Sequence, residues 1–155
     1  MEWAFLGQIG LALAFGLAAM GSSLGIIAAG KAAAGAWAKE AKAGMALRFN
    51  YIIFIGAPIS QTFYAMIVMV QMAKVLEHAS SSAGLMLGIG LATGISEMVS
   101  AWGQGLIGAA ACRCLSEGEG KGLAFLLIAI GIIETVGIFT MVFMLMLAGS
   151  IAGQK

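Results

Sequence analysis

The chain has 155 residues, of which 61% are hydrophobic and only 10% are charged, and its formal net charge is +1. Soluble domains carry roughly 25% charged residues, so this composition argues against a soluble enzyme and against a disordered chain. The small net charge and the absence of a basic stripe disfavour a nucleic-acid-binding protein. A mean hydropathy of +1.02 instead predicts a membrane protein.

Four long apolar stretches predict the helices in chain order, and the only charges within them are Glu97 in the third and Glu134 in the fourth. About 20 apolar residues are enough to cross a bilayer as a helix, and every stretch exceeds that length. A β-barrel is excluded because its strands alternate in polarity, which these stretches do not. We therefore expect an all-α membrane protein with transmembrane helices at 4–30, 49–73, 83–112 and 122–151.

Basic residues predict the orientation. Six of the eight lie in the connections between the first and second helices and between the third and fourth, and two lie at the opposite side. The positive-inside rule then places both connections in the cytoplasm. The two termini and the 74–83 loop, which contains His78, would lie outside. The six basic residues are Lys31, Lys39, Lys42, Arg48, Arg113 and Lys121, and the other two are Lys74 and Lys155.

The chain resembles a tandem duplication. Gln61-Thr62 in the second helix and Glu134-Thr135 in the fourth superpose at an offset of 73 residues. We expect one helical hairpin at 1–78 and a second, carrying the membrane glutamate, at 79–155.

Glycine is concentrated in the first and third stretches, which hold 6 and 7 glycines. Small residues let membrane helices approach closely, and G-x-x-x-G pairs occur at Gly21–Gly25, Gly84–Gly88 and Gly90–Gly94. The second and fourth helices carry bulky runs that suit lipid. This pattern predicts two layers, with thin helices on an inner circle and bulky helices on an outer one. The alternative is ordinary small-residue packing in a four-helix bundle.

Glu134 is the first candidate functional residue, because an ionisable group in mid-bilayer costs at least ~2.5–3.5 kcal/mol on insertion scales and usually marks function. If the second hairpin folds about residue 119, Gln104 lies at the same depth as Glu134. Gln61 occupies the corresponding depth of the second helix. The alternative role for the two glutamines is interhelical hydrogen bonding.

Pro58, the only proline, loosens the backbone before Gln61 and frees a carbonyl. Ser60 and Tyr64 follow on one helix face. All these candidate ligands are oxygens, which suit a hard cation rather than zinc or copper. Cys112 and Cys114 have no histidine near them in the sequence, so we expect no zinc site there.

Glu97 fits this pattern less well. It lies seven residues before Gln104 and hence on nearly the same helix face. We expect a structural or lumen-facing role, in a wetter environment or as a protonated acid, with a second transport role as the alternative.

With these features, the sequence resembles the membrane-ring proteolipid, of the K or c type, of V-type (A/V-type) rotary ATPases along essentially its whole length. The similarity is carried by the duplicated hairpin, the glycine-rich odd helices, the run 58–64 (PISQTFY), Gln104 and Ile133-Glu134-Thr135. It implies a non-catalytic subunit of a homo-oligomeric ring in the V0 sector. The implied partners are the stator a-type (I) subunit, a central-stalk subunit and membrane lipid, and the implied location is a prokaryotic plasma membrane.

The ligand set is similar to that of the sodium-transporting branch, although Ser60 replaces a threonine and Val136 departs from the family pattern. The resemblance implies that Na⁺ is transported in preference to H⁺, and no cofactor is expected. A four-helix multidrug/proton antiporter is the remote alternative, but there the glutamate lies in the first helix among Trp and Tyr. The ligands implied are Glu134, Gln104, Gln61, Ser60, the Ala57 carbonyl and Tyr64, with Thr62 and Thr135 in a possible outer shell.

Overall fold

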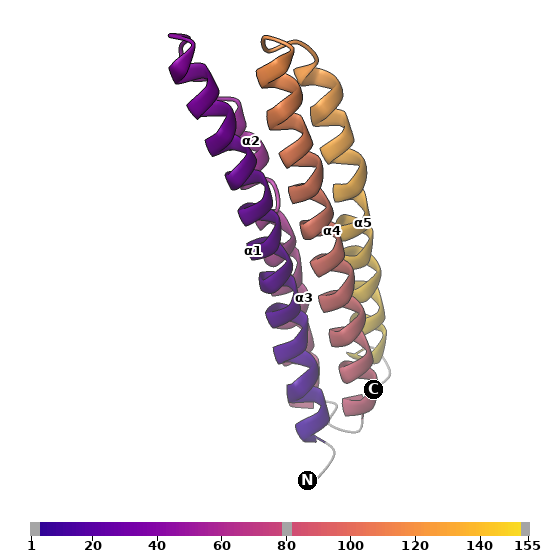
Figure 1. Ribbon diagram of the computed structural model, residues 1–155. Helices are drawn as coiled ribbons and strands as arrows, with labels where there is room; N and C mark the ends of the chain where they lie inside the picture. The colour runs from indigo at the N-terminus through magenta and orange to yellow at the C-terminus, as the bar shows by residue number, and fades with distance from the viewer. Residues whose placement is uncertain (1–3, 79–81, 153–155) are drawn as a thin grey trace.

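The computed structural model describes residues 4–78 and 82–152, and every regular element in these ranges is helical. The elements are α1 (Ala4–Lys42), α2 (Tyr51–Gly56), α3 (Ile59–His78), α4 (Ala83–Glu117) and α5 (Leu123–Ala152) (Figure 1). Four stretches of the described residues are long and apolar enough to span a membrane, with α2 and α3 counted as one. The predicted all-α membrane fold with four spans is therefore confirmed. The expected boundary between the hairpins, after residue 78, and the chain ends lie at or outside the edges of the described residues.

Two helix ends differ from the sequence prediction. We ended the first helix at Gly30, before the first lysine, but α1 continues to Lys42. The stretch 31–42 is rich in alanine, the strongest helix former, and Lys31 lies on an exposed face. The helix is closed beyond Lys42 by Gly44, whose φ of +66° suits glycine, and by a bond from the Met45 N–H to the Glu40 carbonyl (2.9 Å).

The expected 74–83 loop is wrong in its first half, because α3 runs through Lys74 to His78. The α4 helix likewise continues to Glu117 rather than ending at Cys112. In both cases the prediction ended a helix near its first charged residue, whereas an exposed lysine or arginine can stay helical beyond the apolar segment.

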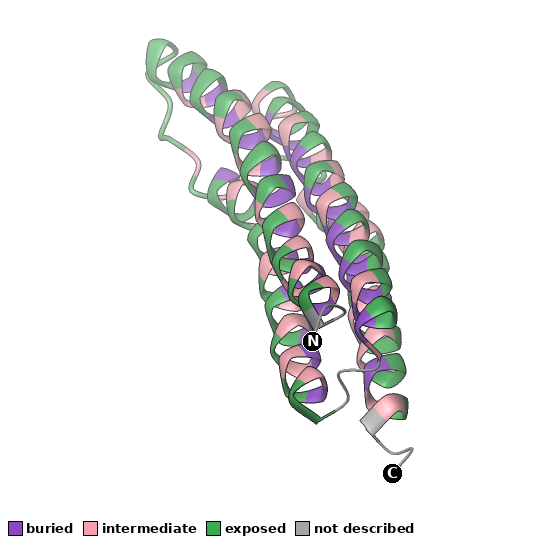
Figure 2. Cartoon of the chain, turned by 90° about the horizontal axis from the view of Figure 1, so that it is seen from below, coloured by how far each residue is buried: buried purple, intermediate pink, exposed green. Residues whose placement is uncertain are grey.

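The helices form two layers (Figure 1). Helices α1 and α4 run parallel and make the most extensive pair, and α3 and α5 lie behind them and contact each other. In Figure 2 the buried residues follow the faces that the helices turn toward one another. The arrangement within one chain agrees with the predicted pairing of thin helices in one layer and bulky helices in the other.

Glycines make the close approach of α1 and α4 possible. A methyl group at Gly90 would lie 2.7 Å from Gly10 Cα, and one at Gly105 would overlap the Gly25 backbone. Gly21 and Gly94 have similar backbone contacts across this interface, but Gly84 and Gly88 face open space within the chain. Two of the three G-x-x-x-G pairs therefore serve the interface in the way expected, and the 84–88 pair does not.

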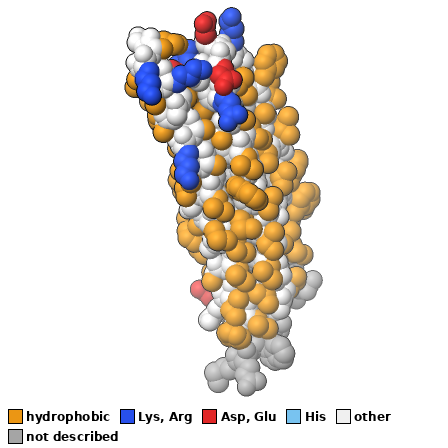
Figure 3. All heavy atoms as spheres, in the orientation of Figure 1, with side chains coloured by type: hydrophobic (Ala, Val, Ile, Leu, Met, Phe, Trp, Pro, Cys, Tyr) orange, Lys and Arg blue, Asp and Glu red, His pale blue; other side chains and the backbone are white. Residues whose placement is uncertain are grey.

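Large apolar side chains cover the face shown in Figure 3, and most of the charged side chains visible there lie toward the end where α1 and α4 finish. Exposed aromatic residues lie on α3 and α5, including Phe63, Phe139 and Phe143. The basic residues of the two connections thus share one end of the molecule, as the sequence suggested. That this end faces the cytoplasm remains a prediction.

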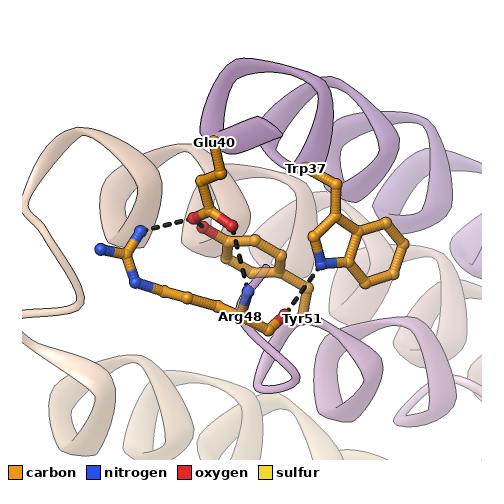
Figure 4. A network of polar contacts seen from close by, with 4 residues as sticks. All are labelled: Trp37, Glu40, Arg48 and Tyr51. Carbon is orange, nitrogen blue, oxygen red and sulfur yellow. Dashed lines mark hydrogen bonds and ion pairs between the residues drawn. The ribbon is translucent and has the colours of Figure 1, made fainter. Parts of the chain in front are cut away.

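A network of hydrogen bonds at this end holds the connection between α1 and α2 in place (Figure 4). The Trp37 indole N–H donates to the Arg48 carbonyl (2.8 Å), and the Arg48 N–H donates to Glu40 Oε2 (3.0 Å). Glu40, which is 1% exposed, also accepts from the Arg48 guanidinium and from the Tyr51 hydroxyl. Arg48, which from the sequence is expected only to mark the cytoplasmic side, thus also helps to fix this connection.

Candidate ion-binding site

Pro58 interrupts the second span, so that α2 ends at Gly56 and α3 begins at Ile59. The loosened backbone carbonyls are not bare. The Ala57 carbonyl accepts from the Ser60 hydroxyl (3.0 Å), and the Pro58 carbonyl accepts from the Ser22 hydroxyl on α1 (2.6 Å). The break therefore leaves two backbone carbonyl oxygens near Gln61, and each accepts a hydrogen bond from a hydroxyl group.

Glu134 and Tyr64 join the two hairpins. The Tyr64 hydroxyl on α3 donates to Glu134 Oε1 on α5 at 2.9 Å. Both side chains are half-buried, so Glu134 lies where it can reach the surface that α3 and α5 share. This hydrogen bond fixes one carboxyl oxygen of Glu134 from the other hairpin.

Two contacts fix the register of α4 against α5. The Ser100 hydroxyl donates to the Ile133 carbonyl (3.0 Å), and Gly137 lies against Glu97. Both pairs centre the hairpin near Glu117, the last residue of α4, rather than at residue 119. Glu134 is therefore level with Ser100.

The predicted alignment of Gln104 with Glu134 consequently needs correction. Gln104 lies four residues beyond Ser100, which is roughly 6 Å along the helix at 1.5 Å per residue. Its side chain is fully buried, and its amide has no hydrogen-bond partner within residues 4–78 and 82–152. The structure thus keeps Gln104 on the buried side of α4 but does not bond it to Glu134.

Gln61 faces α5 at the level of Gly137. A methyl group at Gly137 would overlap Gln61 Oε1 and lie 2.5 Å from Glu97 Oε2, so the two side chains in their present positions occupy the space that a Cβ would take. Gly137 follows Glu134 by three residues and shares its helix face. The amide Nε2 of Gln61 lies 3.4 Å from the Ser60 hydroxyl.

The structure brings some of the predicted residues together and separates others. Gln61, Ser60 and the Ala57 carbonyl form one cluster, and Tyr64 is bonded to Glu134. Thr62 turns toward Ser22 on α1, and Thr135 donates to a carbonyl of its own helix. Their outer-shell role therefore has no contact to support it.

The position of Glu97 agrees with the expected structural role but not with its lumen-facing alternative. Glu97 is 0% exposed, between α4 and the helices that carry Gln61 and Gly137, so it does not line a wet inner surface of the chain. Gly137 is not among the residues predicted from the sequence. A glycine three residues after the membrane glutamate was the available signal.

The second hairpin matches a known family. Residues 87–147 match the family model for the C subunit of ATP synthase. The match covers most of α4 and α5 and includes Glu97, Gln104 and Glu134. The matched segment is less than half of the chain. The search of curated proteins finds no match to the chain.

Proposed function

We propose that the protein is the rotor-ring subunit of the V0 sector of a V-type ATPase or ATP synthase, and that it carries Na⁺ on Glu134. The observation that carries the proposal is the half-buried Glu134, held by Tyr64 from the other hairpin inside the segment that matches the ATP synthase family. The neighbouring oxygens of Gln61, Ser60 and Ala57 supply further hard ligands. The Gln104 amide would complete the set if its side chain adopted another rotamer or if α4 moved along its axis relative to α5.

The position of Glu134 suits an ion that must be exchanged and then shielded. Facing lipid, a bare carboxylate is prohibitively costly, whereas a carboxylate with one bound Na⁺ is neutral. Facing the a-type stator subunit, a basic group there would displace the cation into a half-channel. The difference between these two environments couples ion flow to rotation in either direction.

The charged end of the chain suits the central stalk. A cavity of about 490 Å³ between α1 and α4 is lined by Lys31, Lys39 and Arg113, among other residues. Its lining residues lie in the C-terminal parts of α1 and α4. In the proposed topology this end is cytoplasmic, where a soluble partner can reach it.

Ring assembly is the first test of this proposal. Because a rotor ring works only as a closed circle of copies, we expect the purified protein to keep a closed homo-oligomer in mild detergent. Native mass spectrometry should give one mass that is a whole multiple of the 15.8 kDa chain. A monomer or dimer under these conditions would contradict the ring and favour the antiporter class.

The transported ion is the second element of the proposal. H⁺ is the alternative, since Tyr64 is the only residue of the described chain that hydrogen-bonds to Glu134, and a proton needs fewer ligands than Na⁺. Protection of Glu134 from a carboxyl-directed reagent by Na⁺ distinguishes the two.

A further inference from the structure

The cavity between α1 and α4 carries more positive than negative charge. Lys31 and Lys39 of α1 and Arg113 of α4 line it, and Glu117 is the one acidic residue in its wall. The only ion pair within residues 4–78 and 82–152 joins two residues that do not line the cavity. The three cations therefore outnumber the carboxylate and form no ion pair with it.

Glycine contacts show how α1 and α4 are aligned along their axes. Gly25 lies against the backbone of both Ala101 and Gly105 and is therefore level with the midpoint between them. Because the two helices run parallel, Gly35, ten residues further along α1, is level with Arg113. The lining residues lie within 31–39 on α1 and 109–117 on α4, so this level is the middle of the cavity.

The lysines lie on either side of this middle level. Lys31 and Lys39 are each four residues from Gly35, so they share its helix face and lie roughly 6 Å from it along the axis. No atom lies within 4 Å of the position that a Cβ of Gly35 would occupy, so the space between the lysines is open. An anion placed over Gly35 is within reach of both flexible ammonium groups and of the Arg113 guanidinium.

The cavity also lies at the depth of the lipid head groups. Lys31 is the first basic residue of α1, and Arg113 is the first basic residue of α4. Each ends an apolar segment that is long enough to cross a bilayer. Between the cations, the wall is formed by small apolar side chains, namely Ala32, Ala36, Ala109 and Ala110. Charge at the rim and an apolar wall suit an amphiphilic anion better than a free one.

We propose that this cavity binds the phosphate of an anionic phospholipid. Lys31 and Lys39 pair with its oxygens from α1, and the Arg113 guanidinium donates to them from α4 in the forked geometry that suits a phosphate. The alanines contact the first carbons of the lipid. Basic pockets between membrane helices are known to hold anionic head groups, and the bound lipid offsets the excess positive charge.

This site is separate from the proposed ion carrier. None of its lining residues is among the ligands expected around Glu134, and the site depends on the membrane-spanning fold alone, irrespective of which ion is carried. A soluble partner would meet the connections 43–50 and 118–122, which lie beyond the cavity along both helices. Lipid and central stalk can therefore bind at the same time.

Native mass spectrometry of the detergent-purified protein tests the proposal by counting bound lipids per chain. We expect the protein to retain added phosphatidylglycerol, which is anionic, and to lose phosphatidylcholine, which has the same phosphate but no net charge. The double variant Lys31→Gln/Arg113→Gln should weaken phosphatidylglycerol binding at least about tenfold, given the contribution of each basic residue beside an anionic lipid. The matched control Lys42→Gln/Lys121→Gln removes two exposed cations outside the cavity and should bind as wild type.

Gly35→Leu separates the cavity from charge alone, since it fills the open space and keeps every cation. It should weaken phosphatidylglycerol binding as the double variant does. Equal binding by the cavity and control variants would overturn the proposal, and so would displacement of the lipid by an equal concentration of inorganic phosphate. Unchanged lipid binding in Lys31→Gln/Arg113→Gln with loss of the soluble sector would assign the cavity to a protein partner instead. Because lipids are counted per chain, a protein that forms no ring or carries H⁺ can still pass this test.

Discussion

Replacing Glu134 by glutamine is expected to abolish cation transport while the ring still assembles. The substitution keeps the shape of the side chain and a hydrogen-bonding partner for Tyr64, whose hydroxyl lies 2.9 Å from Glu134 Oε1. It removes the charge that holds the cation. Losing one partner of a buried ion pair costs about 3 kcal/mol or more, so we expect cation affinity to fall at least ~100-fold.

The measurement is ATP-driven cation uptake into vesicles that contain the complete complex, together with the native mass of the purified ring. Glu77→Gln is the matched control, because it removes a carboxylate from an exposed position on α3 and should leave uptake unchanged. Transport at the wild-type rate in Glu134→Gln would show that the ion is carried elsewhere. Loss of the ring mass would show instead that Glu134 is needed for assembly.

Gly90→Ala is expected to give a large loss of stability, because its added methyl group would meet the backbone of α1, as one at Gly105 would. The added carbon would lie 2.5 Å from the Gly10 carbonyl carbon and 2.7 Å from Gly10 Cα. Backbone atoms cannot turn away as a flexible side chain can, so α1 and α4 must separate. Overpacking of this kind typically costs about 1–3 kcal/mol, and we expect the free energy of unfolding to fall by an amount in the upper part of that range.

Gly88→Ala provides the control on the same helix. No atom lies within 4 Å of the position that its Cβ would occupy, and alanine is favoured over glycine in a helix by roughly 0.5–1 kcal/mol. Unfolding in mixed detergent micelles should therefore show a stability equal to or above wild type for Gly88→Ala. Equal stability of the two variants would mean that the glycines do not set the α1–α4 distance.

The spans and their layers were predictable because they depend on composition and spacing alone. Twenty or more apolar residues make a membrane helix irrespective of tertiary contacts, and glycine enrichment marks the helices that approach most closely. Helix ends were less predictable. The polar ends of α1 and α4 remain helical beyond the bilayer-length segment. In α1, the helix propensity of alanine and the cap at Gly44 determine where the helix stops.

The types of residue in the site could be predicted from the sequence, but their relative positions could be predicted only in part. A proline and a glutamate within apolar stretches are visible in the sequence, and the resemblance to the proteolipid family was enough to expect Tyr64 beside Glu134. The depth of Gln104 relative to Glu134 could not be predicted, since it depends on where the α4–α5 hairpin turns. A shift of the fold point from residue 119 to near Glu117 moves Gln104 away from the level of Glu134.

Glu97 shows the limit of sequence reasoning most clearly. Its helix face could be inferred from its spacing to Gln104, but that spacing does not reveal which neighbouring helix covers the face. Gly137 determines this, because the absence of its side chain admits both Gln61 and Glu97. From the sequence, Glu97 is expected either to have a structural role or to line a wet inner surface. In the structure it lies beside Gln61, one of the expected ligands.

The most direct test of the proposal is the rate at which a carboxyl-directed carbodiimide modifies Glu134 in the purified ring, at one fixed pH, with and without NaCl. We predict that NaCl slows the modification of Glu134, with KCl at equal ionic strength as the control, because bound Na⁺ keeps the carboxylate from reacting. Equal rates in NaCl and KCl would contradict Na⁺ as the transported ion. Modification at another residue, with Glu134 unreactive in both salts, would contradict Glu134 as the site.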